Sequence, residues 1–477
     1  MSDVCIFGAT AAGVAAAAGA VEAGAGVTLV ERGSHVGGMV SGGLSWTDVG
    51  DVRVLGGFAR RFYAEVAAHY GVPLWSVRGP EPHVAEAILA SQLAGVDVRL
   101  ATDELPDAAV YVDASYEGDL LARFGVPYRV GREPRALYSE SLAGRQPATR
   151  PGKHNFPVRV SPFRDDGTLL PHIRPPALDE YGWPVDAIGE GDGALQAYGF
   201  RVCLTTAGNR IPFVEPDGYD ESEFELLDRL LAAAPYELPD LLGLVPDLLP
   251  NAKCDVNSIG PFSLNVLDGS NRDYPDGDDD ARVRVRAHHL GYTQRFLWFL
   301  STRFEAMRDW GLCPDEFADT GGWPHQLYIR DGRRMVGECV VREQDLRSGV
   351  QPDDTVALGS YNIDIREIER TWRALPEYVR EDAVFNEGYL SVAVPPYGIP
   401  YRSLTPSRAD ATNLLVPVCL SASHVAFGSV RMEPTLMLLG HAAGHAAAQA
   451  ARRDSAVQDV DVHALQDTLR DAGQVLA

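Results

Sequence analysis

Positive charge is scarce in this sequence of 477 residues. The 42 Lys and Arg residues are outnumbered by 66 Asp and Glu residues, which gives a net charge of −24 at pH 7. Nucleic acids and anionic membranes attract basic surfaces, so this balance argues against both as partners. Hydrophobic residues make up 45% of the chain, which indicates a globular protein long enough for two or three domains.

Closely spaced cysteines are missing as well. No two of the six cysteines form the C-x-x-C pair that is typical of redox and zinc motifs. We therefore expect six reduced thiols, as in a cytoplasmic protein. The six residues are Cys5, Cys203, Cys254, Cys313, Cys339 and Cys419.

Signals for secretion and for membrane insertion are not found. Met1-Ser2-Asp3 leads directly into an apolar strand without a basic stretch, so we expect no signal peptide. The Ala-rich run that starts at Ala9 is interrupted by Glu22 and is too weakly hydrophobic to span a bilayer. These features predict a cytoplasmic protein without a membrane partner.

The N-terminal stretch, in contrast, carries a dense pattern. Val4–Phe7 predicts a buried strand, and a glycine turn and an Ala-rich helix to about Ala23 follow it. A second strand, Val27–Val30, then ends at the acidic residue Glu31. This order of strand, glycine turn, helix, strand and acid is typical of a dinucleotide-binding βαβ unit. The alternative is an ordinary α/β turn with a chance pair of glycines.

Each position of this unit has a chemical reason. Gly8 permits the tight turn, and Gly13 lets the helix lie close to the sheet. The small Thr10 replaces the usual second glycine and lets the backbone approach a pyrophosphate at the helix N-terminus. Glu31 can accept hydrogen bonds from a ribose and repels a 2′-phosphate, which favours FAD or NAD over NADP. The predicted cofactor contacts here are Gly8, Thr10, Ala11, Gly13, Glu31 and Arg32.

A second glycine-rich loop selects flavin over nicotinamide. It follows the second strand directly and contains Gly37, Gly38, Met39, Gly42, Gly43 and Leu44. In FAD enzymes the chain passes the pyrophosphate again at this point, whereas nicotinamide domains need no such loop. A surface loop is the alternative. The chain has no second strand–glycine–helix unit, so we expect non-covalent FAD and no nicotinamide site.

Two later segments are expected to complete the FAD site. The strand Ala108–Asp113 returns to the first sheet, and Ala114, Ser115 and Asp119 would cover the adenosine half. Near the C-terminus a buried strand, Asn413–Leu420, precedes a helix from about Pro434 to Arg452, whose small residues would pack on the first helix. The flavin would lie over the N-terminus of this helix. The predicted contacts here are Phe427, Gly428, Arg431, Glu433 and Pro434.

With these residues in hand, the chain resembles the FAD-dependent oxidoreductases often labelled "xanthan lyase-like". Matching stretches cover almost the whole chain and include HVGGMVSGGLSWTDVG from His35, QLYIRDGRRMVGE from Gln326 and NLLVPVCLSASHVAFGSVRMEP from Asn413. The chain departs from the family pattern at Asp331, Arg366 and His441, where we expect Glu, His and Gln.

The resemblance implies an α/β fold with a glutathione-reductase-type, Rossmann-like FAD-binding domain. It also implies a large inserted α+β substrate domain. We expect residues 1–128 and 399–477 to form the FAD-binding domain and residues 129–398 the insertion. Within the insertion, the hydrophobic pattern predicts a long helix, Arg282–Trp310, a helix, Ile365–Leu375, and a strand, Gln326–Ile329.

Four residues are the candidates for catalysis. His424 follows a buried strand and could act as general base near the flavin; the alternative is a core histidine. Tyr328, Arg333 and Arg334 lie around a glycine turn, where arginines can bind an anionic substrate or tie domains together. Arg431 could face the flavin or a substrate carboxylate; the alternative is an ion pair with Glu433 or another acid. We expect no metal site, because the histidines considered, His288, His289 and His325, lack the H-x-x-x-H spacing.

These residues predict an oxidoreductase that transfers a hydride from a small polar metabolite to N5 of FAD. The arginines would suit a metabolite that is anionic. Oxygen or a separate electron carrier would reoxidise the flavin, and no residue pattern points to a particular oligomer. One alternative is a reductase that uses reduced FAD on a double bond. Another is a binding or assembly protein that holds FAD without turnover.

Overall fold

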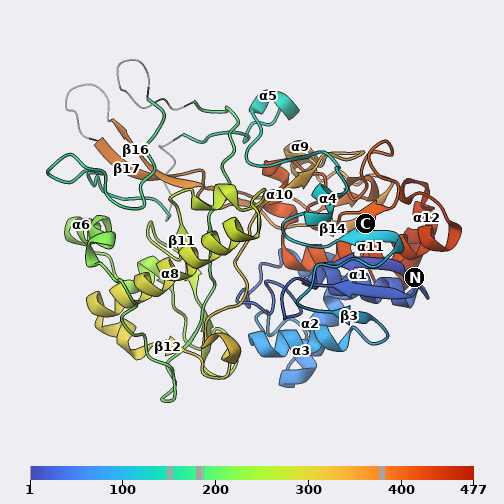
Figure 1. Ribbon diagram of the computed structural model, residues 1–477, viewed down its shortest axis with the longest axis horizontal. Coiled ribbons are helices and arrows are strands. Elements are labelled where there is room, and N and C mark those ends of the chain that lie inside the picture. The colour runs from blue at the N-terminus through green and yellow to red at the C-terminus, as the bar shows by residue number, and fades with distance from the viewer. Residues whose placement is uncertain (1, 148–153, 179–184, 186, 375–381) are drawn as a thin grey trace.

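The computed structural model describes residues 2–147, 154–178, 185, 187–374 and 382–477. Its centre is a parallel sheet of five strands in the order β20-β4-β1-β2-β3, which forms one half of the molecule together with α1 and α11 (Figure 1). The strands are β1 (Ser2–Phe7), β2 (Val27–Val30), β3 (Asp97–Arg99), β4 (Ala108–Asp113) and β20 (Leu414–Leu415). Residues from near the two ends of the chain therefore share one Rossmann-like sheet, as predicted.

The helix α1 (Ala11–Glu22) packs against α11 (Glu433–Arg453), and small residues bring the two backbones together. A Cβ atom at Gly440 would lie 2.1 Å from the Ala12 carbonyl oxygen, and one at Gly444 would lie 2.0 Å from that of Ala16. No larger residue fits at either position unless the helices separate. The predicted packing of these two helices is confirmed.

Other helices surround the sheet or belong to the other half of the molecule. α2 packs on both α3 and α11. The longest helix, α8, belongs to the other half, where most of the small antiparallel sheets lie (Figure 1). These helices are α2 (Gly57–Tyr70), α3 (Pro82–Ser91), α4 (Asp119–Arg123), α5 (Arg135–Tyr138), α6 (Glu225–Ala233), α7 (Leu238–Leu241), α8 (Asp279–Arg303), α9 (Glu343–Ser348), α10 (His424–Val430) and α12 (Val462–Asp471).

The remaining strands form short antiparallel pairs and one three-stranded sheet. The three-stranded sheet joins β7 (Cys203–Thr205) to β9 (Lys253–Asp255) and β12 (Gly311–Leu312). The pairs are β5 (Tyr128–Arg129) with β13 (Arg334–Met335), β6 (Tyr198–Gly199) with β11 (Asn265–Val266), β8 (Leu242–Gly243) with β10 (Asn257–Ser258), β14 (Thr355–Gly359) with β19 (Tyr397–Pro400), β15 (Ile363–Ile365) with β18 (Leu390–Val392), and β16 (Glu369–Ala374) with β17 (Asp382–Glu387).

Some predicted elements differ in the structure. The helix predicted at Ile365–Leu375 is wrong: this stretch ends β15 and forms β16, whose six residues pair with β17, while Leu375 itself lies outside the described residues. Tertiary pairing with a distant strand has overridden a local helical pattern. The predicted strand Gln326–Ile329 is reduced to a single bridge between Tyr328 and Gly199.

Within the described ranges, no helix is long and apolar enough to cross a membrane. The division of the chain after residues 128 and 398 stays a prediction.

Candidate functional site

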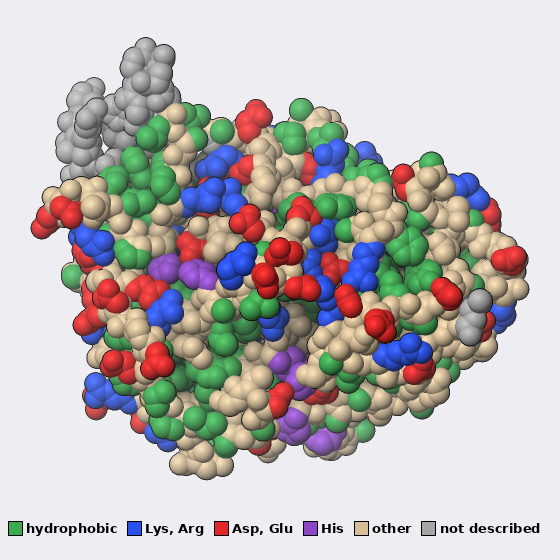
Figure 2. All heavy atoms as spheres, in the orientation of Figure 1, with side chains coloured by type: hydrophobic (Ala, Val, Ile, Leu, Met, Phe, Trp, Pro, Cys, Tyr) green, Lys and Arg blue, Asp and Glu red, His purple; other side chains and the backbone are tan. Residues whose placement is uncertain are grey.

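A cavity of about 660 Å³ opens where the β1–α1 turn meets α8. Its lining comes from both halves of the molecule and includes Gly8, Thr10, Glu31, Arg32, His35, Gly38, Ser115, Tyr116, Asp119, Arg282, Trp323 and His325. Basic and acidic side chains gather over the middle of the face shown in Figure 2. Seven of these lining residues are predicted FAD contacts: Gly8, Thr10, Glu31, Arg32, Gly38, Ser115 and Asp119.

The β1–α1 turn fits a dinucleotide because it leaves no room for side chains. Gly8 has a φ of +98°, and a Cβ atom there would lie 2.7 Å from the Ser115 nitrogen. At Gly13 a Cβ atom would lie 1.9 Å from the Gly8 carbonyl oxygen. The backbone of Thr10 has a φ of −64°, which residues other than glycine adopt readily. Its Oγ1 accepts a hydrogen bond from the Gly13 N–H (3.1 Å) and donates one to the Ala114 carbonyl (2.8 Å). Threonine thus caps α1 and leaves the first N–H groups facing the cavity.

Glu31 lies at the end of β2, with one carboxylate oxygen directed toward the β1–α1 turn and the other toward the segment that follows β2. Each oxygen accepts one backbone hydrogen bond of 2.7 Å, from Ala9 N–H and from Gly33 N–H. A carboxylate oxygen has two lone pairs, so each can also accept from a ribose hydroxyl. The neighbouring Arg32 is held by Asp119 at 3.2 Å and by Asp279 at 2.7 Å.

Replacing Glu31 by Ala is expected to weaken FAD binding about ten- to hundredfold, because a hydrogen bond to a charged group contributes roughly 1.5–3 kcal/mol. Fluorescence titration of the FAD-free protein with FAD measures the dissociation constant. Glu104→Ala, which removes an exposed carboxylate from a nearby loop, is the matched control. Equal affinities of the two variants would contradict the assignment.

Tyr116 joins three segments that were predicted separately. Its hydroxyl accepts from the Met39 N–H at 3.0 Å and donates to Glu433 Oε1 at 2.8 Å. Gly38 must be a glycine here, because a Cβ atom would lie 2.6 Å from that hydroxyl. The second glycine loop, the end of β4 and the start of α11 therefore meet at one side chain. Sequence reasoning missed Tyr116, although it follows the predicted contact Ser115 directly.

Glu433 begins α11 and is almost completely buried. Its Oε2 has no hydrogen-bond partner among the described residues, and burial raises its pKa to about 7. An unpartnered buried oxygen of this kind fits a ligand that carries hydroxyl donors, such as the ribityl chain of FAD. Pro434 occupies the first turn of α11, where no N–H partner is needed.

The rest of the second loop makes close backbone contacts. A Cβ atom at Gly42 would lie 2.3 Å from the Gln326 Cβ, and one at Gly43 would lie 2.4 Å from the Arg201 carbonyl oxygen. Gly428 lies inside α10, and a Cβ atom there would lie 2.8 Å from Cγ1 of Ile365. Ala11, Gly37, Leu44, Ala114 and Phe427 are buried in the surrounding turns and helices. Contact of these residues with FAD stays a prediction.

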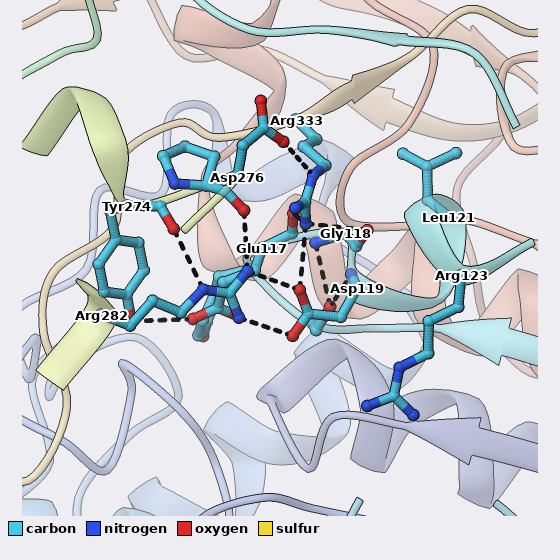
Figure 3. A network of polar contacts seen from close by, with 12 residues as sticks. Glu117, Gly118, Asp119, Leu121, Arg123, Tyr274, Asp276, Arg282 and Arg333 are labelled. Carbon is cyan, nitrogen blue, oxygen red and sulfur yellow. Dashed lines mark hydrogen bonds and ion pairs between the residues drawn. The ribbon is translucent and has the colours of Figure 1, made fainter. Parts of the chain in front are cut away.

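Asp119 is the centre of a network of arginines beside the cavity (Figure 3). Arg282 donates to both of its oxygens, at 2.8 and 2.7 Å, and Arg333 donates to one at 3.0 Å. Burial raises the pKa of Asp119, but the arginines outweigh burial and hold it below its ordinary value. Arg333 also reaches Asp276 at 2.9 Å. This arginine thus links α4 to the loop before α8.

Arg334 is likewise engaged within the protein. Its guanidinium donates to Glu133 at 2.7 Å and to the Gly131 carbonyl at 2.6 Å, and it is 1% exposed. These contacts correspond to the alternative in which the arginines tie segments together. A role of Arg333 or Arg334 in binding substrate stays a prediction.

Arg330 differs from these two arginines. Its guanidinium stacks on the ring of Tyr328, 4.1 Å from the centroid, and it donates to the Ala197 carbonyl. It is 4% exposed, and within the described part of the chain no carboxylate lies within ion-pair distance of it. Burial first, and then the neighbouring Arg366 and Arg431, lower its pKa to about 9.

Arg431 connects Tyr328 to β15. It donates to the Tyr328 hydroxyl at 3.3 Å and to the Asp364 carbonyl at 3.0 Å, and it lies 3.5 Å from the Asp364 carboxylate. Burial lowers its pKa, but Tyr328 and Asp364 outweigh burial and raise it. This contact corresponds to the alternative of an ion pair with an acid other than Glu433.

His424 is the first residue of α10 and is 3% exposed. Its backbone N–H donates to Glu133 at 2.9 Å, and its Nδ1 lies 3.2 Å from Asp331 Oδ2. Neither Nδ1 nor Nε2 has a hydrogen-bond partner in the described part of the structure, so Asp331 lies at ion-pair distance from the ring without a hydrogen bond to it. A carboxylate on one side and a free nitrogen on the other is the arrangement that a general base requires.

Comparison of the sequence with known proteins identifies a family. The sequence matches the family described as FAD dependent oxidoreductase over residues 3–109 and 105–469. A search of curated proteins found no match.

Three solved structures are similar to a part of this chain. BexE, from a study of oxidation during BE-7585A biosynthesis, is 18% identical over 28% of this chain and 35% of that chain, with a TM-score of 0.22. The anhydrotetracycline hydroxylase OxyS from Streptomyces rimosus is 19% identical over 28% and 35%, with a TM-score of 0.21. THI4 from Thermovibrio ammonificans is 19% identical over 28% and 66%, with a TM-score of 0.20. The matched part thus spans about a third of the first two structures.

The family match extends over most of the chain and includes the glycine turn and the acid after β2, which line the cavity, and the helix α11, whose Glu433 contacts the cavity-lining Tyr116. The narrower "xanthan lyase-like" label stays a prediction. The chain belongs to the FAD dependent oxidoreductase family.

Proposed function

We propose that this enzyme oxidises a small metabolite that carries a carboxylate or a similar anion, at a C–H bond next to oxygen or nitrogen. FAD, when bound, supplies the two-electron acceptor for the hydride. The observation that supports an anionic substrate is the buried guanidinium of Arg330, which has no carboxylate within ion-pair distance among the described residues. The charge of Glu367 acts on it only from farther away. Burying a charge without a counter-ion costs several kcal/mol, so a site of this kind favours an anionic ligand.

The neighbours of Arg330 are suited to holding such a ligand. The Tyr328 ring fixes the guanidinium plane, and the Tyr328 hydroxyl meets Arg431. Arginine can grip a carboxylate through two parallel hydrogen bonds, which orients as well as binds it. Asp48 is exposed to solvent and lies close enough to Arg431 for their charges to interact. It would offer an acceptor for a hydroxyl or amino group of the substrate.

His424 is the proposed proton acceptor. Oxidation of an alcohol or amine releases a proton as the hydride leaves, and the free Nε2 of His424 can take it. Asp331 faces Nδ1 and would keep the ring in one tautomer and stabilise the imidazolium that forms. Both side chains are buried, so water would not compete for the proton.

Anaerobic reduction of the flavin tests this function. We expect 2-hydroxy acids or amino acids to bleach the flavin absorbance, whereas the corresponding amides and diols do so at least about tenfold more weakly, since they lack the charge that Arg330 binds. Bleaching by neutral polyols as efficient as by their acids would contradict an anionic substrate. Absence of bleaching, with reoxidation of reduced protein by an unsaturated acid, would favour the reductase alternative.

Arg330→Met keeps the volume of the side chain and removes its charge. We expect KM to rise about 10–100-fold with kcat less affected, because a hydrogen bond to a charged group contributes roughly 1.5–3 kcal/mol. Arg408→Met, which removes an exposed arginine paired with Asp459, is the control. An unchanged KM in Arg330→Met would place the anion site elsewhere.

The cysteines bear on the compartment in which the protein works. All six are free thiols, including Cys203 and Cys313, whose sulfur atoms lie 3.6 Å apart without a disulfide between them. This supports a reducing compartment such as the cytoplasm. Oxygen or a separate electron carrier would accept the electrons, which stopped-flow reoxidation of the reduced enzyme can distinguish.

A further inference from the structure

Two histidines and a glutamate meet where α1 ends beside α11. His441 and His445 are four residues apart on α11, so their side chains lie on the same face of the helix. Glu22 is the last residue of α1, and its Oε2 lies 2.9 Å from His441 Nε2 and 3.4 Å from His445 Nε2. Three potential ligand atoms thus converge on one point. The H-x-x-x-H spacing that we expected to be missing is present here.

The imidazole rings of His441 and His445 are buried, and most of their nitrogen atoms make no hydrogen bond to the described residues. His441 is 1% and His445 is 6% exposed. Neither nitrogen of His445, nor Nδ1 of His441, has a hydrogen-bond partner among the described residues. Gly19 provides the space for both rings, because a Cβ atom there would lie 3.1 Å from the Cδ2 of each. Buried polar atoms without partners require an explanation such as an ion or a water molecule.

The donor set and its spacing suit zinc. Bonds of about 2.0–2.1 Å in a tetrahedron place neighbouring ligand atoms about 3.3 Å apart, close to the 3.4 Å between His445 Nε2 and Glu22 Oε2. Imidazole nitrogens and a carboxylate oxygen are all common zinc ligands.

The surroundings of Glu22 allow a cation to enter. Arg61 on α2 donates to Oε1 at 2.6 Å, which orients the carboxylate and leaves Oε2 for the histidines. The positive charge of Arg61 opposes a cation, whereas the carbonyl end of α1 attracts one. Glu22 is partly open to solvent, so a water molecule can supply the fourth ligand. The cluster lies about 18 Å along α1 from its first residue, well away from the glycine turn.

We propose that Glu22, His441 and His445 form a binding site for Zn²⁺ or a similar divalent transition-metal ion. The ion would link α1 to α11. The other ends of these helices lie at the β1–α1 turn, which lines the FAD cavity, and at Glu433, which contacts the cavity-lining Tyr116. It would act as a structural cross-link, with a water molecule completing the tetrahedron.

A second cluster of acids and histidine offers the matched control. Glu81, His83 and Glu316 also bring their ligand atoms together. The ammonium group of Lys253 already fills that centre, at 2.6 Å from both Glu81 and Glu316. A cation site that holds a lysine has no place for a metal ion. Substitution of His83 therefore changes a similar cluster without affecting the proposed site.

The test uses the FAD-bound protein after treatment with a chelator. Zn²⁺ is titrated in competition with a chromophoric chelator, and thermal unfolding is followed with and without Zn²⁺. We expect one equivalent to bind and to raise the unfolding temperature. His445→Ala and Glu22→Gln are expected to lower the Zn²⁺ affinity at least about tenfold, and His83→Ala to leave it unchanged.

Co²⁺ gives a second measurement that does not depend on stability. In a tetrahedral nitrogen–oxygen site it absorbs at longer wavelengths than the flavin, and Glu22→Gln should lose this absorption while it keeps the fold. Substoichiometric Zn²⁺ binding by the wild-type protein would overturn the proposal. Binding that is equal in wild type, Glu22→Gln and His445→Ala would overturn it as well.

Discussion

His424→Ala is expected to retain FAD and to slow reduction of the flavin by substrate about 10²–10⁴-fold, the usual effect of losing an acid–base group. Nδ1 of His424 faces Asp331, so Nε2, which has no partner among the described residues, is the nitrogen that can accept a proton. Alanine removes the proton acceptor from a buried site that water enters poorly. Anaerobic stopped-flow reduction with saturating substrate measures the rate, and His463→Ala, on the exposed face of α12, is the control.

Asp331→Asn separates a catalytic from a structural role. An amide in place of the carboxylate keeps the shape but no longer stabilises the imidazolium, so we expect a smaller loss of rate and a changed dependence on pH. Should His424→Ala reduce at the wild-type rate, His424 is a core histidine. The proton acceptor would then be sought at Tyr328 or Asp48.

Gly444→Ala is expected to destabilise the protein by about 3 kcal/mol or more, because the new methyl group overlaps backbone atoms that cannot move independently. Its carbon would lie 2.0 Å from the Ala16 carbonyl oxygen and 3.0 Å from the Ala16 Cα. α1 and α11 would have to separate, which would displace the start of α11, where Glu433 contacts the cavity-lining Tyr116. We therefore expect weaker FAD retention together with a lower unfolding temperature.

Gly291→Ala in α8 is the matched control for this substitution. A Cβ atom there meets only the end of the flexible Arg295 side chain, at 2.8 Å, which can move aside. Alanine favours helix over glycine by about 1 kcal/mol, so this variant should be as stable as the wild type or more so. Similar unfolding temperatures for both variants would show that the α1–α11 contact tolerates a larger separation.

The N-terminal unit could be predicted closely because its structure is determined locally. Val27–Val30 and Ala108–Asp113 are strands with the bounds that the sequence predicts. Short apolar runs bounded by glycine leave few alternatives. The packing of α1 on α11 was also predictable, since small residues at Gly440 and Gly444 have few other reasons to recur in a helix.

The site could be predicted only as a set of segments. The chain does not reveal that Asp331 faces His424, or that Arg333 is paired with Asp119, because these partners lie far apart in sequence. Arginines that look available for a ligand in the sequence can be engaged by acids in the fold. The strand β16 was missed for a similar reason, since its partner β17 decides its conformation.

The contacts of α11 with the N-terminal part of the chain have a consequence for synthesis of the protein. Tyr116 can form its hydrogen bond to Glu433 only after more than 300 further residues have been added to the chain. Closing so long a loop is slow, because its entropy must be overcome before the contacts form. On the ribosome the Ala-rich face of α1 therefore stays uncovered until α11 emerges. The nascent chain would depend on chaperones during that interval, and cofactor loading would be among the last steps of maturation.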